Sequence, residues 1–280
     1  MVVAMKIETP PVVLVFGGTD PTGGAGVFAD CLTLASFGCH PAAVVTAVTA
    51  QDTTGIKQFS CVETALVIAQ ARAVLEDMPV AAFKTGMLGN RRIVSAVASI
   101  VHDYPNIPLI VDPVQTSGAG HALTEESLDD ALRSLLLPRA NLITPNSLEA
   151  RKLAPGADTL DACAHELMEI GCEYVLITGT HEPTSQVMNR LYGRRGLLET
   201  YAAERLPQEF HGSGCTLASA CAATLAHGLE MNAAVAEALR YTCNTLKAGH
   251  RIGMGQHLPN RPYWSGKSFV RRRTPETNEQ

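Results

Sequence analysis

The chain has 280 residues, of which 46% are hydrophobic and 18% charged, a composition that excludes an intrinsically disordered protein. Its 22 Lys and Arg residues stand against 27 Asp and Glu residues, and the formal charge of −5 gives no basic field that would hold nucleic acid. The 8 cysteines form no CxxC pair, and the apolar run Val12–Phe16 is too short to cross a bilayer. We therefore expect a cytoplasmic protein with reduced cysteines, no membrane contact and a core large enough to fold alone.

Short β-rich runs alternate with Ala- and Leu-rich stretches along the first two thirds of the chain. This rhythm predicts an α/β fold with one doubly wound, mostly parallel sheet that is covered by helices on both faces. The predicted strands, each followed by a turn signal, are Val12–Phe16, Ala42–Thr46, Ala82–Lys84, Leu109–Val111, Asn141–Thr144 and Tyr174–Thr178.

The last third of the chain has a different pattern. Looser alternation predicts a small antiparallel hairpin over Gln186–Tyr201 at the sheet edge, and two long helices are expected at Cys215–His227 and Asn232–His250. No repeat and no Gly/Ser linker marks a boundary. We therefore expect a single domain over residues 1–266 and a mobile C-terminal tail over residues 267–280.

A glycine-rich turn, Gly17-Gly18-Thr19-Asp20-Pro21-Thr22-Gly23-Gly24-Ala25-Gly26, directly follows the first predicted strand and opens into a helix that carries Asp30. Ligands of doubly wound sheets bind outside the carboxyl ends of the strands, where glycines let backbone amides come close. The spacing is neither a Walker A loop nor GxGxxG. A purely structural tight turn is the alternative interpretation.

A second glycine-rich segment, His211-Gly212-Ser213-Gly214-Cys215-Thr216, precedes a helix of small residues. Free amides at such a helix start, together with the helix dipole, form an anion site. Cys215 near that N-terminus would have its thiolate favoured, which makes it a candidate base or nucleophile. The alternative is a small residue that closes a helix cap.

Two further strand ends carry oxygen ligands suited to Mg²⁺, Val111-Asp112-Pro113 and Thr144-Pro145-Asn146-Ser147-Leu148-Glu149, although ordinary helix capping would explain each of them. Another strand ends in Lys84-Thr85-Gly86-Met87-Leu88-Gly89, where Met87 is placed to line a flat apolar ligand. A simple strand-end charge is the alternative interpretation of Lys84. Together these segments describe a phosphotransferase without a P-loop.

In this order the motifs resemble the hydroxymethylpyrimidine/phosphomethylpyrimidine kinases of the ribokinase-like superfamily. The motifs are Gly18-Thr19-Asp20-Pro21, Gly23-Gly24-Ala25-Gly26, Asp30, Ala50-Gln51-Asp52-Thr53, Lys84-Thr85-Gly86-Met87-Leu88, Val111-Asp112-Pro113-Val114, Thr144-Pro145-Asn146 with Glu149, and Gly212-Ser213-Gly214-Cys215-Thr216. The resemblance covers about residues 12 to 255. It implies ATP-dependent phosphorylation of 4-amino-5-hydroxymethyl-2-methylpyrimidine and then of its monophosphate, in thiamine synthesis.

The resemblance also implies site residues for phosphoryl transfer. Cys215 would stand where most ribokinase-like enzymes have an aspartate base, and the amides of Gly212, Ser213 and Gly214 would hold charge on the transferring phosphoryl group. Catalysis would then consist mostly of positioning and electrostatics.

For the pyrimidine, the resemblance assigns hydrogen bonds with the aminopyrimidine edge to Asp30 and Gln51, and ring contacts to Gly18 and Met87. An amide and a carboxylate can read a donor–acceptor pattern that an apolar slot cannot.

For the cofactors, ATP and Mg²⁺, Thr178-Gly179 would lie beside the nucleotide, and Asp112, Asn146 and Glu149 would organise the metal through water. By analogy with the superfamily we expect a homodimer, and the need for a monovalent cation is left open.

Two positions depart from the family pattern. A flap lysine is expected after the Val111-Asp112-Pro113-Val114 strand, but Gln115-Thr116-Ser117-Gly118-Ala119-Gly120 follows it. The common Lys-Gly-Gly of the nucleotide site is Thr178-Gly179-Thr180 here. Another group must therefore neutralise the phosphates, and the candidates are His181, His121 or an arginine.

Three alternative functions remain open at this point. A pyridoxal or pyridoxine kinase shares the fold and the metal, and also acts on a flat ring with a hydroxymethyl group, although Gln51 and Met87 favour the aminopyrimidine. A non-catalytic pyrimidine or nucleotide sensor would explain the two missing lysines. A nicotinamide oxidoreductase fits only the first strand and turn, because its acidic ribose ligand is not evident.

Overall fold

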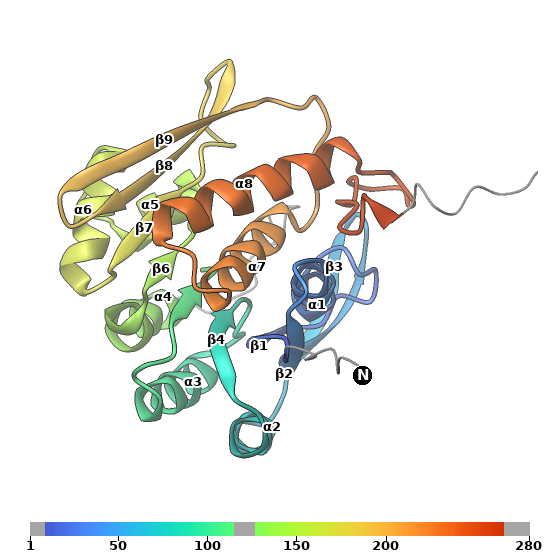
Figure 1. The fold of residues 1–280 in the computed structure, drawn as a ribbon, viewed down its shortest axis with the longest axis vertical. Helices are drawn as coiled ribbons and strands as arrows, with labels where there is room; N and C mark the ends of the chain where they lie inside the picture. Colours follow the sequence, from blue (N-terminus) through green and yellow to red (C-terminus); the bar gives the residue numbers. More distant parts are fainter. Residues whose placement is uncertain (1–8, 115–126, 266–280) are drawn as a thin grey trace, which may run out of the picture.

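The computed structural model describes residues 9–114 and 127–265, and it contains one sheet with strand order β3-β2-β1-β4-β5-β6-β7-β8-β9 (Figure 1). The neighbouring strands β2, β1, β4, β5, β6 and β7 run parallel to one another. β3 pairs antiparallel with β2, β8 with β7, and β9 with β8. The strands are β1 Val12–Gly18, β2 His40–Asp52, β3 Gly55–Cys61, β4 Val80–Thr85, β5 Leu109–Val111, β6 Leu142–Ile143, β7 Tyr174–Ile177, β8 Gln186–Gly193 and β9 Gly196–Glu204.

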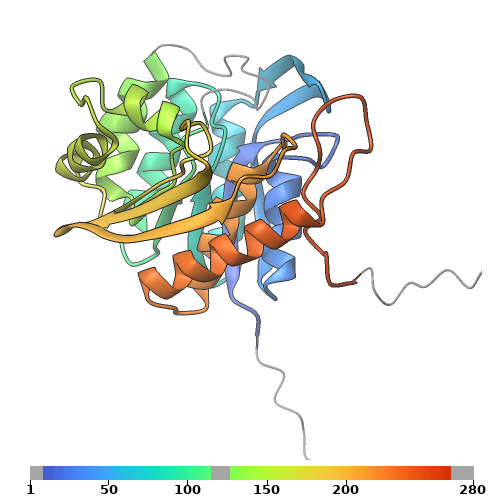
Figure 2. The same ribbon diagram turned by 90° about the horizontal axis from the view of Figure 1, so that it is seen from above.

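Helices cover both faces of the sheet, as Figure 2 shows with α7 and α8 in orange on one side and the yellow-green helices on the other. On one face lie α1 Gly26–Ser36, α7 Ser213–Ala226 and α8 Met231–Lys247. On the other lie α2 Thr64–Asp77, α3 Arg91–Asp103, α4 Ser127–Ala131, α5 Ser147–Leu153 and α6 Leu160–Ile170, with a π-turn and a 3₁₀ turn over Leu132–Leu136 and Leu137–Arg139.

The β1 strand explains why both faces need a cover. Leu14 and Phe16 pack into the core on the α2 and α3 side, whereas Val13 and Val15 pack into the core on the α1 and α7 side. Side chains of a strand alternate between faces, so a strand that is apolar at every position is stable only between two helical layers. The α/β class and the six predicted parallel strands are confirmed.

The sheet differs from the prediction at the β3 edge. The predicted strand Ala42–Thr46 is the middle of the long β2, which continues to Asp52 and turns into the antiparallel β3. Exposed and half-buried residues follow one another irregularly along β3. Its sequence therefore shows no regular alternation of polar and apolar residues, and the pattern does not predict this strand. At the opposite edge the predicted hairpin is confirmed as β8 and β9, joined at Gly196 with φ +90°.

The parallel strands bring the motif-bearing segments to one edge of the sheet. Gly18 ends β1, Thr85 ends β4, and Asp112 and Thr144 directly follow β5 and β6.

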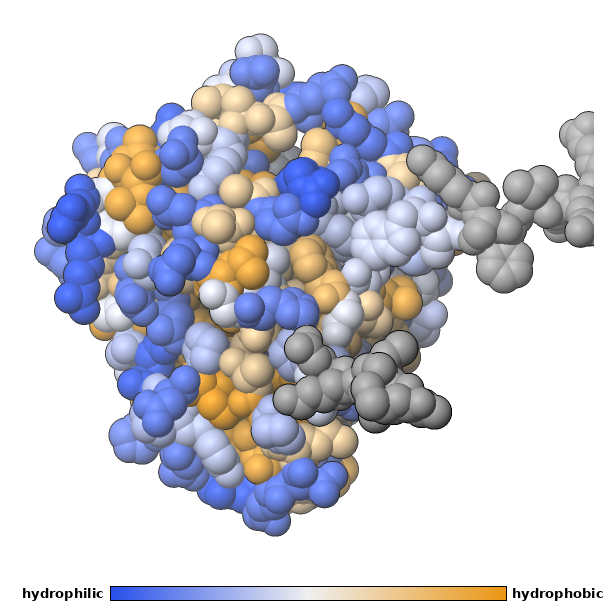
Figure 3. Space-filling model, in the orientation of Figure 1, coloured by the Kyte–Doolittle hydropathy of each residue, from blue (hydrophilic) through white to orange (hydrophobic). Residues whose placement is uncertain are grey.

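On the surface of the molecule, the face drawn in Figure 3 has hydrophobic residues that lie between hydrophilic ones. Within the described residues, no helix combines the length and apolarity needed to span a bilayer. The flap Gln115–Gly120, His121 and the predicted tail lie outside the described residues.

Candidate active site

A cavity of about 580 Å³ opens at the carboxyl ends of the parallel strands. It brings together segments that are far apart in the sequence, from the end of β1 to the start of α7. The predicted site residues that line it are Gly18, Asp30, Gln51, Met87, Asp112, Asn146, Glu149, Thr178, Gly212, Ser213, Gly214 and Cys215. Gly179 does not line the cavity. A Cβ there would meet the Met188 carbonyl oxygen at 2.3 Å, so glycine allows this loop to pack on β8.

Asp20 organises the first glycine turn. Its Oδ1 accepts hydrogen bonds from the Thr22 amide (2.9 Å) and hydroxyl (2.8 Å), and its Oδ2 accepts one from the Ala25 amide (2.8 Å). Burial alone would raise the pKa of Asp20, but hydrogen bonds from His211 and Thr22 lower it, so the carboxylate stays charged. The turn needs glycine at Gly26, because φ is +61° and a Cβ would meet the Gly18 oxygen at 2.3 Å.

His211 connects this turn to the predicted ring-binding residue Gln51. His211 Nε2 lies 2.8 Å from Asp20 Oδ2 and 2.7 Å from the terminal amide of Gln51. The side-chain nitrogen of Gln51 lies against His211 Nε2, and Gln51 Oε1 lies 3.3 Å from the Thr49 hydroxyl, which also donates to the Thr19 carbonyl (2.8 Å). These contacts fix the position of the Gln51 side chain.

Lys84 is fully buried beneath the cavity, so its interpretation as a strand-end charge is wrong. Its Nζ lies 2.9 Å from Asp30 Oδ1 and 3.4 Å from Asp112 Oδ2. Burial alone would lower the pKa of Lys84, but Asp30 and the nearby acidic groups raise it, so the ammonium remains charged.

Asp30 has a different role from the one expected. It has no exposed surface, and its carboxylate accepts hydrogen bonds from Lys84 (2.9 and 3.1 Å) and from Ser219 Oγ (2.7 Å). These contacts hold Asp30 in the ion pair, so the geometry does not support a direct hydrogen bond from Asp30 to the ring. The carboxylate instead fixes the position of the Lys84 ammonium.

Cys215 lies at the start of α7, next to Asp112, with which it forms a side-chain hydrogen bond. The expected thiolate is wrong for this environment, because burial and the Asp112 charge raise the pKa of Cys215 to about 12. The nearby Lys84 and a hydrogen bond from the Gly26 amide act in the opposite direction without reversing the shift. Cys215 is therefore a thiol in this structure, and helix position alone does not activate it.

Asn146 and Glu149 form a capping box at the start of α5. The Asn146 side chain accepts from the Leu148 and Glu149 amides at 2.9 Å, and Glu149 Oε2 accepts from the Asn146 amide at 2.9 Å. Capping is thus one role of these residues, and both also line the cavity. Within residues 9–114 and 127–265, no three His, Cys, Asp or Glu side chains are grouped to hold a metal ion by themselves.

Arg205, which the motifs did not identify, follows β9 and lines the cavity near Thr178. Its guanidinium donates to three carbonyl oxygens of one loop, those of Thr180 (2.6 Å), Glu182 (2.9 Å) and Thr184 (3.0 Å). His181, an earlier candidate, lies in the same loop and also lines the cavity. No sequence pattern marks Arg205, because its contacts depend on how β9 and this loop pack.

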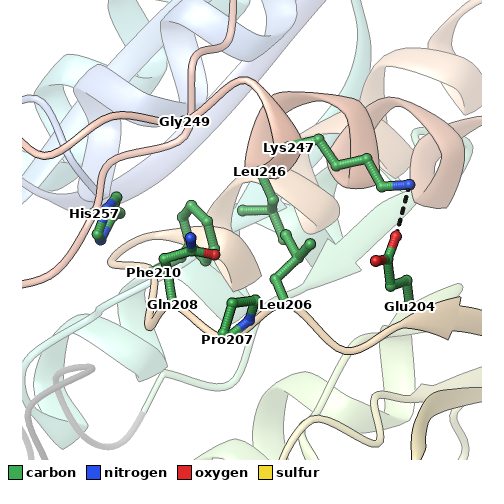
Figure 4. Close-up of a pocket in the computed structure, with 9 residues that line it drawn as sticks. All are labelled: Glu204, Leu206, Pro207, Gln208, Phe210, Leu246, Lys247, Gly249 and His257. Atoms are coloured by element: carbon green, nitrogen blue, oxygen red, sulfur yellow. Dashed lines mark ion pairs between the residues drawn. The ribbon is translucent and has the colours of Figure 1, made fainter.

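A smaller pocket of about 360 Å³ adjoins this part of the cavity. Figure 4 shows Leu206, Phe210 and Leu246 on its walls, and these three residues also line the larger cavity. An ion pair between Lys247 Nζ and Glu204 Oε2 (3.2 Å) closes one side. The cavity therefore continues between the β9–α7 connection and the end of α8.

Comparison with known proteins agrees with this geometry. The hydroxymethylpyrimidine/phosphomethylpyrimidine kinase of Mycobacterium tuberculosis is 41% identical over 260 residues, which cover 91% of this chain and 94% of that protein. An ADP complex of Bacillus subtilis pyridoxal kinase has a TM-score of 0.83 at 26% identity and covers 92% of this chain and 99% of that one. Phosphomethylpyrimidine kinase from Clostridium difficile has a TM-score of 0.74 at 29% identity, with coverages of 85% and 100%.

The ribokinase-like fold expected from the motifs is thereby confirmed. A model of the phosphomethylpyrimidine kinase family matches residues 20–260, which include the start of α7 and the ends of β4, β5 and β6 at the cavity. The match extends over most of the chain, and so this chain belongs to the phosphomethylpyrimidine kinase family.

Proposed function

We propose that the protein uses ATP to phosphorylate 4-amino-5-hydroxymethyl-2-methylpyrimidine, and then phosphorylates the monophosphate to the diphosphate, in thiamine synthesis. One observation carries the proposal: Gly18, Gln51 and Met87 line the same cavity as the amides at the start of α7. Kinase relatives that are matched over nearly their whole length support this reaction.

Ring recognition follows from the fixed amide of Gln51. With its nitrogen against His211 and its oxygen towards Thr49, Gln51 still offers an N–H donor and an oxygen lone pair to the cavity. An aminopyrimidine presents a ring nitrogen acceptor next to an amino donor, so the two edges are complementary. Gly18 leaves room for a flat ring, since a Cβ there would meet the Met87 sulfur at 3.1 Å.

Phosphoryl transfer is assigned to the start of α7. The amides of Gly212, Ser213 and Gly214 stabilise charge on the transferring group, and Lys84 supplies a positive charge beneath them. The acceptor hydroxyl loses its proton late in a loose transition state, so a strong base is not required. We propose that the Cys215 thiol orients this hydroxyl, and that the hydroxyl proton passes to an oxygen of the transferred phosphoryl group as the new bond to phosphorus forms.

The carboxylates fit an indirect Mg²⁺ site. Asp112 Oδ2 is buried without a hydrogen bond to any described residue, and the Lys84 ammonium lies 3.4 Å from it. Mg²⁺ keeps several waters and uses one or two protein carboxylates, so Asp112 and Glu149 suffice without a complete cage. Bound Mg²⁺ supplies neutralisation of the nucleotide's phosphate oxygens.

We propose that Arg205 and Lys84 replace the two family lysines. Arg205 lies at the nucleotide end beside Thr178 and His181, whereas Lys84 lies below the start of α7. The two positive charges thus stand at opposite ends of the expected path of the phosphates. Neither residue stands at the position of the flap lysine or of the Lys-Gly-Gly lysine.

Coupled ATP turnover with Mg²⁺ tests the function, with hydroxymethylpyrimidine, its monophosphate and pyridoxal as acceptors and with product masses read by mass spectrometry. We expect mono- and diphosphorylated pyrimidine. Cys215→Ala is expected to lose most of the turnover, and full activity of this variant would contradict the role of Cys215.

Pyridoxal phosphorylation is the second candidate function. The B. subtilis pyridoxal kinase structure superposes closely, with a TM-score of 0.83. A phosphorylated pyridoxal product without a phosphorylated pyrimidine would keep the mechanism and change the acceptor. Absence of turnover with every acceptor would favour the non-catalytic sensor.

A further inference from the structure

Arg261 is a buried arginine, 2% exposed, in the segment that follows α8. Its Nε donates to Thr216 Oγ1 (3.1 Å), its Nη1 to the Gly23 carbonyl (3.1 Å), and its Nη2 to the carbonyls of Gly24 (2.6 Å) and Gly212 (3.5 Å). In the part of the chain that the structure describes, no carboxylate lies within ion-pair distance of this guanidinium. Arg261 also does not line the cavity.

Within the described residues, the hydrogen-bond partners of the Arg261 guanidinium all come from the two glycine turns. Gly23 and Gly24 belong to the turn after β1, whereas Gly212 and Thr216 belong to the start of α7. On the side of the cavity, the hydrogen bond between His211 and Asp20 joins the same two turns. The turns are therefore linked twice, once at the cavity wall and once through a buried cation.

The contact between the turns is too close for side chains. A Cβ on Gly212, which has φ +80°, would meet the Gly24 oxygen at 1.9 Å, and a Cβ on Gly24 would meet the His211 ring at 2.6 Å. Backbone carbonyls from both turns consequently face a small common space, where their partial negative charges repel one another. A planar guanidinium with five donors can satisfy several such oxygens at once, which a lysine cannot.

The orientation of these carbonyls fixes the amides that face the phosphoryl group. In a trans peptide the C=O and the following N–H point in opposite directions, so the Gly212 carbonyl sets the direction of the Ser213 amide. Thr216 Oγ1 accepts a hydrogen bond from Arg261 and donates one to the same Gly212 carbonyl at 2.8 Å. The guanidinium therefore also holds the Gly212 carbonyl indirectly, through the Thr216 hydroxyl. The Ser213 amide is one of the unpaired donors at the start of α7.

We propose that Arg261 is a positioning residue for phosphoryl transfer: it holds the two glycine turns at one separation, so that the amides of α7 meet the acceptor bound at the first turn. The inference rests on the proposed function. A misplacement of about 1 Å in such a site, or the loss of one oxyanion donor, lowers the rate roughly 10²-fold. The effect falls on kcat, because these amides bind the transition state more strongly than the ground state.

The test compares R261K and R261A with the wild-type chain in steady-state kinetics. We expect R261K to lose about tenfold in kcat, with the KM values for ATP and the pyrimidine within about twofold of wild type, because lysine reaches only some of the oxygens. R261A is expected to lose about 10²-fold, and added guanidinium at low millimolar concentration should restore part of kcat. A merely structural arginine would show neither the selective fall in kcat nor the rescue.

Tyr241→Phe provides the matched control. The Tyr241 hydroxyl donates to the backbone carbonyl of Arg261 (3.1 Å), so its removal loosens the same segment without touching the guanidinium. We expect a lower melting temperature and an unchanged kcat for this variant. The inference is overturned if folded R261K keeps the wild-type kcat, or if kcat falls only in proportion to the folded fraction measured by circular dichroism. Should R261A fail to fold, R261K alone decides, and absence of turnover in the wild-type chain would instead refute the proposed function.

Discussion

The two ends of the cavity are built in different ways. At the acceptor end, buried side chains bond to one another: Asp20 with His211, His211 with Gln51, and Lys84 with Asp30. At the nucleotide end, Arg205 instead holds a partly exposed loop through its backbone carbonyls. Side-chain networks fix which acceptor fits, whereas backbone contacts tolerate changes of side chain. This difference fits the departure from the family's Lys-Gly-Gly at Thr178-Gly179-Thr180, in the loop that Arg205 holds.

The largest expected effect comes from removing the buried charge at the acceptor end. Lys84→Met leaves Asp30 and Asp112 without their cation, which should cost about 3–5 kcal/mol of unfolding free energy. Urea unfolding measures the loss. Lys57→Met, which breaks the exposed pair with Asp52, is the control and should leave the midpoint unchanged. If the two variants lost similar amounts of unfolding free energy, the buried ion pairs of Lys84 would be no more stabilising than the exposed pair of Lys57.

The second prediction concerns the reactivity of Cys215. A thiol with a pKa of about 12 is almost entirely protonated at pH 8, so iodoacetamide should modify Cys215 about 10³-fold more slowly than a small free thiol. Alkylation of Cys215 should become fast only as the pH approaches 12. Because the thiol does not ionise between pH 7 and 9, kcat should not rise over this range through deprotonation of Cys215. Rapid alkylation at pH 8, located by mass spectrometry, would show that the thiolate is present.

The third prediction tests whether the acceptor end alone reads the ring. Gln51→Ala removes one donor and one acceptor and should lower kcat/KM for the pyrimidine about 10- to 100-fold, while the KM for ATP stays the same. Steady-state kinetics with each substrate varied in turn separates the two constants. An equal change in the KM for ATP would mean that the two ends are not independent.

The smallest expected effect lies at the nucleotide end. Arg205→Ala should raise the KM for ATP about tenfold without changing the KM for the pyrimidine, because a charge-assisted contact and the loop geometry are lost together. Arg194→Ala, at the exposed tip of the β8–β9 hairpin, is the matched control for the loss of an arginine. If both variants bind ATP like the wild type, the cation at this end is not Arg205.

Much of the fold was accessible from the sequence, because strands buried on both faces are apolar at most positions and several of the turns after them carry glycine. The segment that became β3 was not, since a half-exposed edge strand has no regular alternation. In the site, the motifs predicted the residues that line the cavity but not the contacts among them. Asp30 was expected at the ring and is held by Lys84, and Cys215 was expected as a thiolate and is a thiol.

The sequence by itself therefore determined the layered α/β fold, the family and the segments that meet at the carboxyl edge of the sheet, because each depends on local patterns and on their order. Only the tertiary structure decided which charges are buried, which pKa values shift and which residue joins the two glycine turns. Those properties depend on distances between residues as far apart in the chain as Gly24 and Arg261, and on the exclusion of water from the space between them.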